Sequence, residues 1–252
     1  MGMPAPLTTS ASRLFVRRRG TFPTFQAFIS IMRSDLPLDV STLVTPPFQE
    51  NTLFVSLPRS QECLVIDPGF GSQRILEKLN VLGKTPVAIL LTHGHVDHIA
   101  GVGGLREVWP ELPILIGAGD APLLSDPQLN LSALFGMPLT APDATQTLKH
   151  AERLLIAGIP LEVREIPGHS PGHVVFVHLD DSQPIVLGGD VLFQGSIGRT
   201  DFPGGDQKML IDGIHRHLFD LPDNTLVFPG HGPPTTTGQE KRDNPRSEEH
   251  TS

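Results

Sequence analysis

Short apolar runs and helical patterns alternate along the chain from Val40 onward. Runs that are apolar throughout or at every second position, and that end in Gly, Pro or Asp, predict strands. Such runs occupy residues 40–48, 51–58, 62–70 and 85–93. Between the last two, apolar side chains recur at helical spacing through residues 72–83, and Gly83 suits the end of a helix.

The second half of the chain repeats this alternation. Residues 103–120 predict a helix, a turn marked by proline and a strand, and residues 206–221 predict an amphipathic helix. Further strands are predicted at residues 160–169, 172–181, 184–190 and 224–231. Residues 120–150 are rich in Leu, Pro and Ala with weak periodicity, so both a helical and a loop insertion that walls a pocket stay open. Strands alternating with helices predict an α/β layered domain.

Length and the two ends set the limits of that domain. The 252 residues, 38% of them hydrophobic, are enough for one core, so we expect a single domain at residues 32–245. Residues 1–31 fit either a transit peptide or an untranslated leader, and we favour the leader because strand-like alternation follows Met32. We expect residues 246–252 to be a non-native tail, because one back-translation of RSEEHTS matches a common sequencing-adapter read; an ordinary polar tail is the alternative, and in both cases His250 is no ligand.

Charge and cysteine content exclude several classes of protein. The formal charge is −8, and because residues 1–34 contain five arginines and no acidic residue, the remainder carries −13. Such an acidic body disfavours nucleic acid as a partner. The lone Cys63 lies in a predicted strand, and we expect it to be a small, buried apolar side chain. No apolar run reaches the roughly 18 residues of a membrane span. We therefore expect a soluble protein, cytoplasmic, or mitochondrial if residues 1–31 are a transit peptide.

The predicted strands end in metal-capable side chains. Separate apolar runs end at His93, His169, Asp190 and His231, each after a polar, Gly or Pro position. Functional residues in α/β sheets collect just beyond strand ends, where a rigid scaffold directs them at one cleft. The loop that begins at His93 adds three more such side chains: His95, Asp97 and His98. Seven candidate ligands are thus expected in one place.

These motifs resemble those of a known family. THGHVDH at residues 92–98 fits the His-x-His-x-Asp-His signature of the metallo-β-lactamase superfamily, and PGHSPGH, LGGD and FPGHG follow in that superfamily's order. Within it, residues 189–206 are similar to the small glyoxalase II-like branch, the hydroxyacylglutathione hydrolases. The resemblance covers about residues 38–245 and implies a four-layer αββα sandwich.

The resemblance also implies two metal sites. The first ion would be held by His93, His95 and His169 and the second by Asp97, His98 and His231. Asp190 would bridge the two ions, and Asp97 and Asp190 would be the catalytic carboxylates. Imidazole and carboxylate suit zinc, iron and manganese, and zinc is the ion that we expect. Two such ions would share one hydroxide and leave a positive charge facing the substrate.

Other titratable residues carry weaker predictions. A histidine after a strand is usually at the surface or hydrogen-bonded in the core, and we assign His178, His215 and His217 to that class. Asp67 and His173 have two interpretations, as groups that orient ligands or as a turn aspartate and a strand-entry histidine.

The expected reaction is hydrolysis of a thioester such as S-lactoylglutathione, in which the bridging hydroxide attacks the carbonyl and a thiolate leaves. Arg199 resembles by position the basic residue that binds the glycine carboxylate of glutathione in glyoxalase II; a buried or helix-capping arginine is the other interpretation. Two departures from glyoxalase II stand out. The chain ends where that family's C-terminal helical domain would begin, and it contains no tyrosine.

Three alternatives to thioester hydrolysis remain. A persulfide dioxygenase would use the same scaffold with one iron on His93, His169 and Asp190. A lactonase or β-lactamase would direct the same hydroxide at a ring carbonyl. A non-catalytic binding module is disfavoured because it would not need all seven ligands. The expected partner is a small-molecule substrate.

Overall fold

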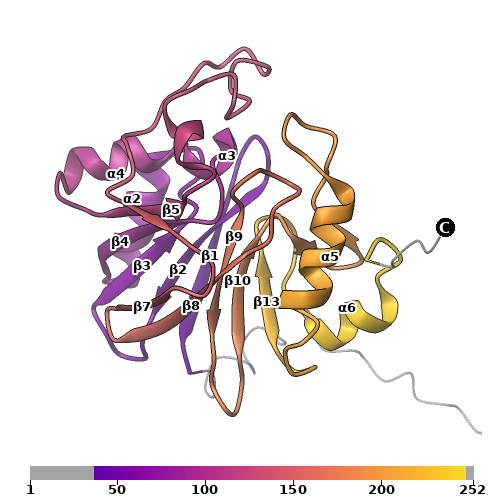
Figure 1. Cartoon of the computed structure of the whole chain (residues 1–252). Helices are drawn as coiled ribbons and strands as arrows, with labels where there is room; N and C mark the ends of the chain where they lie inside the picture. Colours follow the sequence, from indigo (N-terminus) through magenta and orange to yellow (C-terminus); the bar gives the residue numbers. More distant parts are fainter. Residues whose placement is uncertain (1–36, 248–252) are drawn as a thin grey trace, which may run out of the picture. The chain divides into compact units, whose positions relative to one another are not determined.

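Two six-stranded sheets face each other across a shared apolar core (Figure 1). The computed structural model describes residues 37–247, which belong to one compact unit, Leu36–Ser252. The strands of the first sheet, in spatial order, are β1 (Asp39–Thr45), β2 (Glu50–Ser56), β3 (Glu62–Ile66), β4 (Thr85–Leu91), β5 (Ile114–Gly117) and β6 (Gln146–Leu148). Those of the second sheet are β14 (Thr235–Thr236), β13 (Leu226–Pro229), β10 (Ile185–Gly189), β9 (Val174–His178), β8 (Ile159–Glu165) and β7 (Arg153–Ile156).

The helices lie on the outer faces of the sheets (Figure 1). They are α2 (Ser72–Leu82), α3 (Val96–Ile99), α4 (Val102–Val108), the 3-10 turn η1 (Ala121–Leu124), α5 (Gln207–His217) and α6 (Thr237–Asp243). Side chains of α2 and α4 form an apolar cluster with the first sheet, and side chains of α5 form another with the second. A short hairpin of β11 (Leu192–Phe193) and β12 (Ser196–Ile197) adjoins the second sheet near β13. The predicted αββα sandwich is confirmed.

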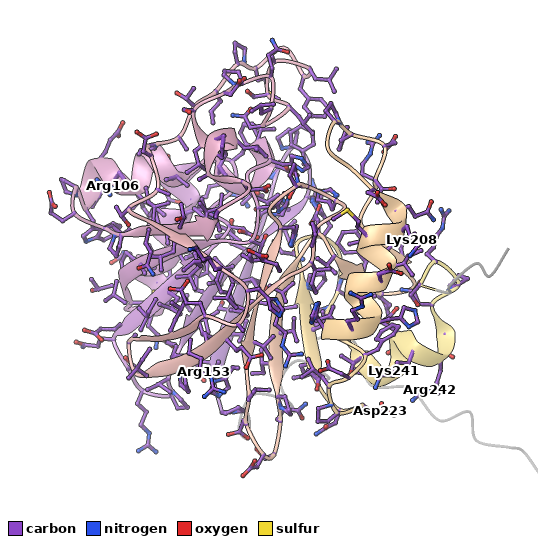
Figure 2. The ribbon with its side chains drawn as sticks, viewed as in Figure 1. Arg106, Arg153, Lys208, Asp223, Lys241 and Arg242 are labelled. Atoms are coloured by element: carbon purple, nitrogen blue, oxygen red, sulfur yellow. The ribbon has the colours of Figure 1, made fainter. Side chains whose placement is uncertain are left out.

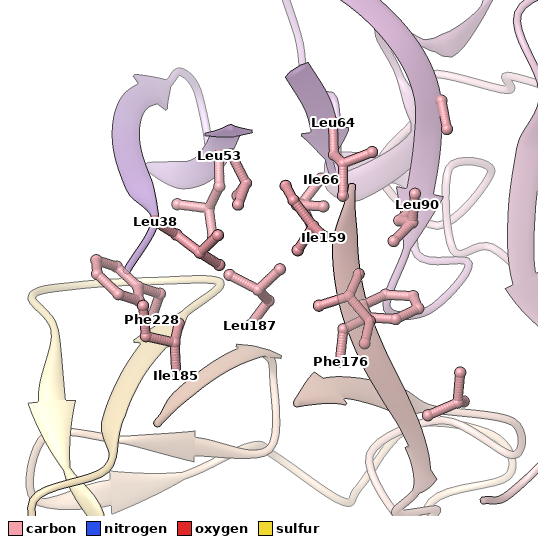
Figure 3. Close-up of a cluster of buried hydrophobic side chains, with 14 of the residues drawn as sticks. Leu38, Leu53, Leu64, Ile66, Leu90, Ile159, Phe176, Ile185, Leu187 and Phe228 are labelled. Carbon is pink, nitrogen blue, oxygen red and sulfur yellow. The ribbon is translucent and has the colours of Figure 1, made fainter. Parts of the chain in front are cut away.

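Alternating side chains of β3 show how the layers are held together. Leu64 and Ile66 point into the core between the sheets, where Figure 3 shows them among side chains of both sheets. Cys63 and Val65 point the other way, into the cluster with the helices. A strand that buries both faces reads as a continuous apolar run, as residues 62–66 do. Burial also raises the pKa of the Cys63 thiol to about 11, so the reactive thiolate is scarce at neutral pH.

Local sequence chemistry sets the ends of the long helices. Gly83 ends α2 in the left-handed region, at φ 64°, as the sequence predicts. Asp206 caps the start of α5, where its carboxylate accepts a hydrogen bond of 2.9 Å from the Met209 N–H.

The short helix α6 is tied to the loop before β13 by an ion pair: Lys241 reaches Asp223 with an Nζ–Oδ1 distance of 2.8 Å (Figure 2).

Several short elements were not predicted, and the β7–β8 hairpin shows why. Ile156 pairs with Ile159, so the two-residue turn consists of Ala157 and Gly158, both at positive φ. Turns of this kind are usually recognised by Asn-Gly or Asp-Gly, and this turn has Ala-Gly instead. Strand β6, the β11–β12 hairpin, β14, α3 and α6 are likewise too short for a periodic pattern to reveal.

The segment at residues 120–150 is mostly a loop, which decides between the two predicted forms. Apart from η1 and β6 it consists of turns and irregular backbone. The buried Asn130 side chain holds it by donating to the Leu123 and Leu139 carbonyls at 3.0 and 2.9 Å. A loop held by hydrogen bonds of this kind need not repeat apolar residues at a fixed spacing, which explains its weak periodicity.

The two chain ends are described only in part. The predictions for residues 1–31 lie outside the described residues, as do those for residues 248–252, His250 included. Of the tail predicted to be non-native, the structure describes Arg246 and Ser247; the Ser247 carbonyl accepts a hydrogen bond from His215 at 2.7 Å. Among residues 37–247, no helix combines the length and apolar character that a membrane span requires.

Candidate metal centre

The ends of four strands bring the predicted ligands together. His93 follows β4, His169 follows β8, Asp190 follows β10 and His231 follows β13. Strands β10 and β13 are parallel neighbours, so the last two residues leave the second sheet at the same edge. The other three ligands lie in the loop after β4 and in α3, which contacts β2.

A first group consists of His93, His95 and His169. One nitrogen from each ring lies within 4.8 Å of the others, and the three residues are 0%, 5% and 3% exposed. His95 Nδ1 faces His169 Nε2 at 3.0 Å. These are the three residues predicted for the first ion.

A second group consists of Asp97, His98 and His231, again with ligand atoms within 4.8 Å of one another. The His231 Nε2–Asp97 Oδ2 distance is 3.3 Å. Asp190 lies between the groups: its Oδ2 is 3.6 Å from His169 Nε2 and 3.5 Å from His231 Nε2. The structure therefore brings all seven predicted ligands together in the predicted grouping.

The chemistry of this cluster fits metal ions. His93 Nε2, His98 Nε2 and Asp190 Oδ1 are buried and have no hydrogen-bond partner. Unsatisfied buried polar atoms are costly, and three of them converging on one place indicate a ligand that would satisfy them. Imidazole nitrogens and carboxylate oxygens are donors that zinc, iron and manganese accept.

Similarity to known proteins agrees with this geometry. The sequence profile described as the metallo-beta-lactamase superfamily matches residues 45–231, most of the chain.

The chain belongs to the metallo-β-lactamase superfamily.

Relatives within the superfamily include named hydrolases. "Probable metallo-hydrolase YqgX" of Bacillus subtilis (strain 168) is 41% identical over 200 residues, 79% of this chain and 92% of the relative. Hydroxyacylglutathione hydrolase GloC of Haemophilus influenzae is 33% identical over 217 residues, 82% of this chain and 97% of the relative. These matches identify the chain as a metallo-hydrolase of the superfamily.

Solved structures of the superfamily share the whole described fold. The BLEG-1 B3 metallo-β-lactamase has a TM-score of 0.77 at 37% identity, over 82% of this chain and 98% of that one. TTHA1623 in a di-iron-bound form has a TM-score of 0.72 at 37% identity, over 82% and 99%. The fold and the resemblance predicted from the sequence are confirmed.

Hydrogen bonds at the histidine rings of this chain determine which ring nitrogen faces the cluster. His169 Nδ1 lies 2.8 Å from the Arg199 backbone carbonyl. A carbonyl only accepts, so Nδ1 carries the proton and Nε2 turns a lone pair toward the cluster. His98 Nδ1 lies 3.1 Å from Asp67 Oδ2, and this contact directs His98 Nε2 toward the cluster.

Asp67 proves to be an orienting group as well as a turn residue. It is 2% exposed with φ 48°, and it accepts hydrogen bonds from the Thr92 N–H and hydroxyl at 2.7 and 2.6 Å. It also forms a three-residue group with His93 and His98 that could hold an ion. Because both its oxygens already accept hydrogen bonds, we assign it to orientation of His98 and not to ligation.

Proton affinities in the cluster favour neutral rings at His93 and His95 and ionised carboxylates; burial, followed by the nearby His98, holds the pKa of His93 well below its usual value. Burial, followed by the nearby His169, lowers the pKa of His95 to about 3, so the ring is unprotonated at neutral pH. Burial alone would raise the pKa of Asp190, but His98 and the other imidazoles bring it below its usual range. Burial would lower the pKa of His98, yet Asp190 and Asp97 hold it well above the usual value.

His173 also acts within the site, so the orienting interpretation is the one that the structure supports. Its Nε2 accepts a hydrogen bond of 3.1 Å from the Asp190 N–H, and its ring stacks on His93 at 4.8 Å. By contrast His178 is bonded to the Pro160 carbonyl at 2.9 Å, away from the cluster.

Asp120 is a positioning residue that the sequence analysis missed. Its carboxylate is fully buried and accepts hydrogen bonds from the Gly94 N–H at 2.9 Å, the Ser170 hydroxyl at 2.6 Å and the Gly172 N–H at 2.6 Å. Gly94 lies between two ligands of the first group, and Ser170 follows the third. One carboxylate thus holds both loops that carry the first group. Asp120 follows β5, so the strand-end argument used for the ligands also points to it.

The glycine of the FPGHG motif is required by close approach. A Cβ on Gly230 would lie 2.2 Å from Asp190 Oδ1 and 2.7 Å from His98 Cε1. Any larger residue there would push the Asp190 carboxylate or the His98 ring out of place.

A pocket of about 340 Å³ opens over the cluster. Arg199 lines it, and its side chain is 56% exposed, which excludes a buried arginine; its guanidinium hydrogen bonds go to Asp201 and not to the carbonyls of a helix end. The guanidinium makes two bonds of 2.7 Å to the Asp201 carboxylate and lies 3.9 Å from the centre of the Phe202 ring. Arg199 therefore contributes its carbonyl to His169 and its charged side chain to the pocket wall.

Proposed function

We propose that this chain is a dinuclear metallohydrolase that cleaves thioesters such as S-lactoylglutathione. The observation that carries the proposal is the pair of complete ligand groups, joined by Asp190, at the base of one open pocket. The similarity to hydroxyacylglutathione hydrolase GloC supports the thioester as the class of substrate.

The proposed roles follow the two groups. The first ion would be held by His93, His95 and His169, the second by Asp97, His98 and His231, and Asp190 would contact both. When bound, two divalent ions supply water activated near neutral pH and positive charge that polarises a carbonyl.

The chain's own residues prepare the site for that chemistry. The Arg199 carbonyl and Asp67 fix the rings of His169 and His98, so the ligand nitrogens need no reorganisation when an ion binds. Burial alone would raise the pKa of Asp97, but the nearby His98 and His231 lower it by more, so this pKa lies below its usual range. Asp97 and Asp190 are therefore ionised at neutral pH, where they offset cationic charge and accept hydrogen bonds from water in the pocket.

Arg199 is the proposed substrate-binding residue. Its guanidinium lines the pocket and is more than half exposed, so a substrate carboxylate can reach it. That carboxylate would share the guanidinium with Asp201, which weakens the attraction relative to a free arginine.

The proposed ions are zinc, with iron and manganese as chemically suitable occupants of the same donors. The di-iron form of TTHA1623, at 37% identity, supports iron as the strongest competitor. A single-iron dioxygenase on His93, His169 and Asp190 would leave the complete second group without a role, so the geometry favours two ions.

One experiment tests the proposal directly. The full chain is purified, its metals are counted by elemental analysis, and hydrolysis of S-lactoylglutathione is measured beside oxygen uptake with glutathione persulfide. We expect two ions per chain and thioester cleavage. One iron per chain with oxygen uptake and no hydrolysis would overturn the proposal in favour of the dioxygenase.

β-Lactam hydrolysis is a second candidate function. It is favoured by the similarity to the BLEG-1 B3 metallo-β-lactamase, which has the higher TM-score of the two structures compared above. A ring amide and a thioester present the same carbonyl to the site, so a β-lactam belongs in the same assay. Cleavage of the β-lactam with no cleavage of any thioester would replace the thioester proposal.

A further inference from the structure

Two parts of the chain line the pocket beside the metal cluster, and they differ in polarity. Residues 193–202 supply apolar side chains together with Ser196 and Arg199. The lining residues from the earlier part, Phe48, Val96, Leu131 and Phe135, are all apolar, and we call them the apolar side. A substrate with one polar and one apolar end would therefore have a defined orientation.

The apolar side is built by segments far apart in the sequence. Phe48 lies in the loop between β1 and β2, and its ring packs edge-on against Phe135 with centroids 5.0 Å apart. Phe70 supports Phe48 from the loop after β3, at 5.8 Å. Leu131 and Phe135 both belong to the loop at residues 120–150; Leu131 is buried, and Phe135 is 43% exposed. Edge-to-face aromatic pairs hold their rings in place, so this side is preformed.

Charge locates the polar end of the substrate. Among the described lining residues outside the metal cluster, Arg199 alone carries a charge, and it belongs to the other side. The partners of its guanidinium are Asp201 and the Phe202 ring. Among the described lining residues, the side chains of Phe48, Val96, Leu131 and Phe135 offer no charge or hydrogen-bonding group to a polar substituent placed against them.

We propose that the preferred substrates are thioesters with an apolar acyl group, which lies against Phe48, Leu131 and Phe135 while the thiol portion faces Arg199. This inference rests on the proposed thioester hydrolysis. In the reaction, water adds its oxygen to the acyl carbon, the carbon–sulfur bond breaks, and a carboxylic acid and a thiol are released. The short, hydroxylated lactoyl group would use little of the apolar surface.

A series of acyl chains on one thiol tests the proposal. The metal-loaded full chain is assayed with the acetyl, butyryl and hexanoyl thioesters of glutathione and with S-lactoylglutathione. We expect kcat/KM to rise roughly fourfold for each added methylene group, the fold-change that burial of one methylene gives. Hydrolysis of all four thioesters with no dependence on acyl length would overturn the inference and leave the proposed function standing.

Variants locate the acyl site. Phe135→Ala should reduce the dependence on acyl length to less than about twofold per methylene, because it removes the aromatic surface and its contact with Phe48. Leu134→Ala is the matched control: Leu134 is adjacent, is 67% exposed and does not line the pocket, so it should keep the full dependence. An equal effect of both variants would contradict the assignment of the apolar side.

Inert analogues separate failure of the inference from failure of the proposed function. The affinities of S-methyl, S-butyl and S-hexyl glutathione, thioethers that cannot be hydrolysed, are measured by calorimetry with and without added metal. Tighter binding of longer chains without cleavage of any thioester would overturn the proposed function and retain the apolar site. Equal affinities across the series would overturn the inference whatever the activity.

Discussion

The two ligand groups are built differently although they share Asp190. The first, His93, His95 and His169, consists of imidazoles that are at most 5% exposed. The second includes the carboxylate of Asp97, and the His231 side chain is 28% exposed. A hydrogen-bonded carboxylate, Asp120, holds the loops of the first group from behind, whereas the second group spans α3 and the loop after β13.

This difference indicates an order of binding. The rings of His93 and His95 are buried and neutral at neutral pH, whereas the raised pKa of His98 means that an ion must displace a proton from the second group, so the first group should bind more tightly. The more exposed second group should exchange its ion faster.

Asp190→Ala should have the largest effect because it removes the carboxylate that both groups share. We expect hydrolysis to fall on the order of 10⁴-fold, comparable to removal of a principal catalytic group. The affinity for both ions should fall together, measured by competition with a chelator. Asp190→Asn should behave similarly; retention of both ions and full activity in either variant would remove Asp190 from the bridge.

Asp97→Ala should separate the groups. We expect the metal content to fall from two ions to one, with the first ion retained, and hydrolysis to fall on the order of 10²-fold to 10³-fold through lost electrostatic stabilisation. Asp143→Ala is the control, because Asp143 is exposed and lies outside the pocket lining. Full hydrolysis with one ion per chain would refute the dinuclear assignment.

Asp120→Asn should weaken the first group selectively. An amide has one acceptor oxygen and a donor group, so at least one of the Gly94, Ser170 and Gly172 donors would lose its partner. We expect the affinity for the more tightly held ion to fall roughly 10-fold to 100-fold and the free energy of unfolding to fall by about 1–3 kcal/mol. If the second ion were lost first and the first ion were held as tightly as before, the positioning role would be wrong.

The convergence of the seven side chains could be predicted from the sequence because their positions depend on local patterns. Four apolar runs are each followed by a polar, Gly or Pro residue and then by a metal-capable side chain, and this pattern is visible without knowledge of the fold. The four side chains are His93, His169, Asp190 and His231. The layers followed from the alternation of apolar strands and helices. The grouping into two sites came from the resemblance to the superfamily, and the structure places the residues accordingly.

The parts that were missed depend on contacts between distant segments. Asp120 accepts from residues 26, 50 and 52 positions away, and no residue type announces such a convergence. The role of the Arg199 carbonyl is independent of the side chain, so residue chemistry could not reveal it. Strand β7 was missed because its turn uses Ala157 in place of Asn or Asp.

Arg199→Ala should have the smallest effect on metal binding, since only the backbone of this residue contacts His169. The variant retains the carbonyl, so the proton on His169 Nδ1 keeps its acceptor and Nε2 keeps its direction. We expect the affinity of the first group to change by less than roughly twofold, as for an ordinary surface substitution, while KM for a thioester with an anionic thiol rises. A tenfold loss of the first ion would show that the guanidinium and its pairing with Asp201 hold the loop, and the first group would then depend on the pocket wall.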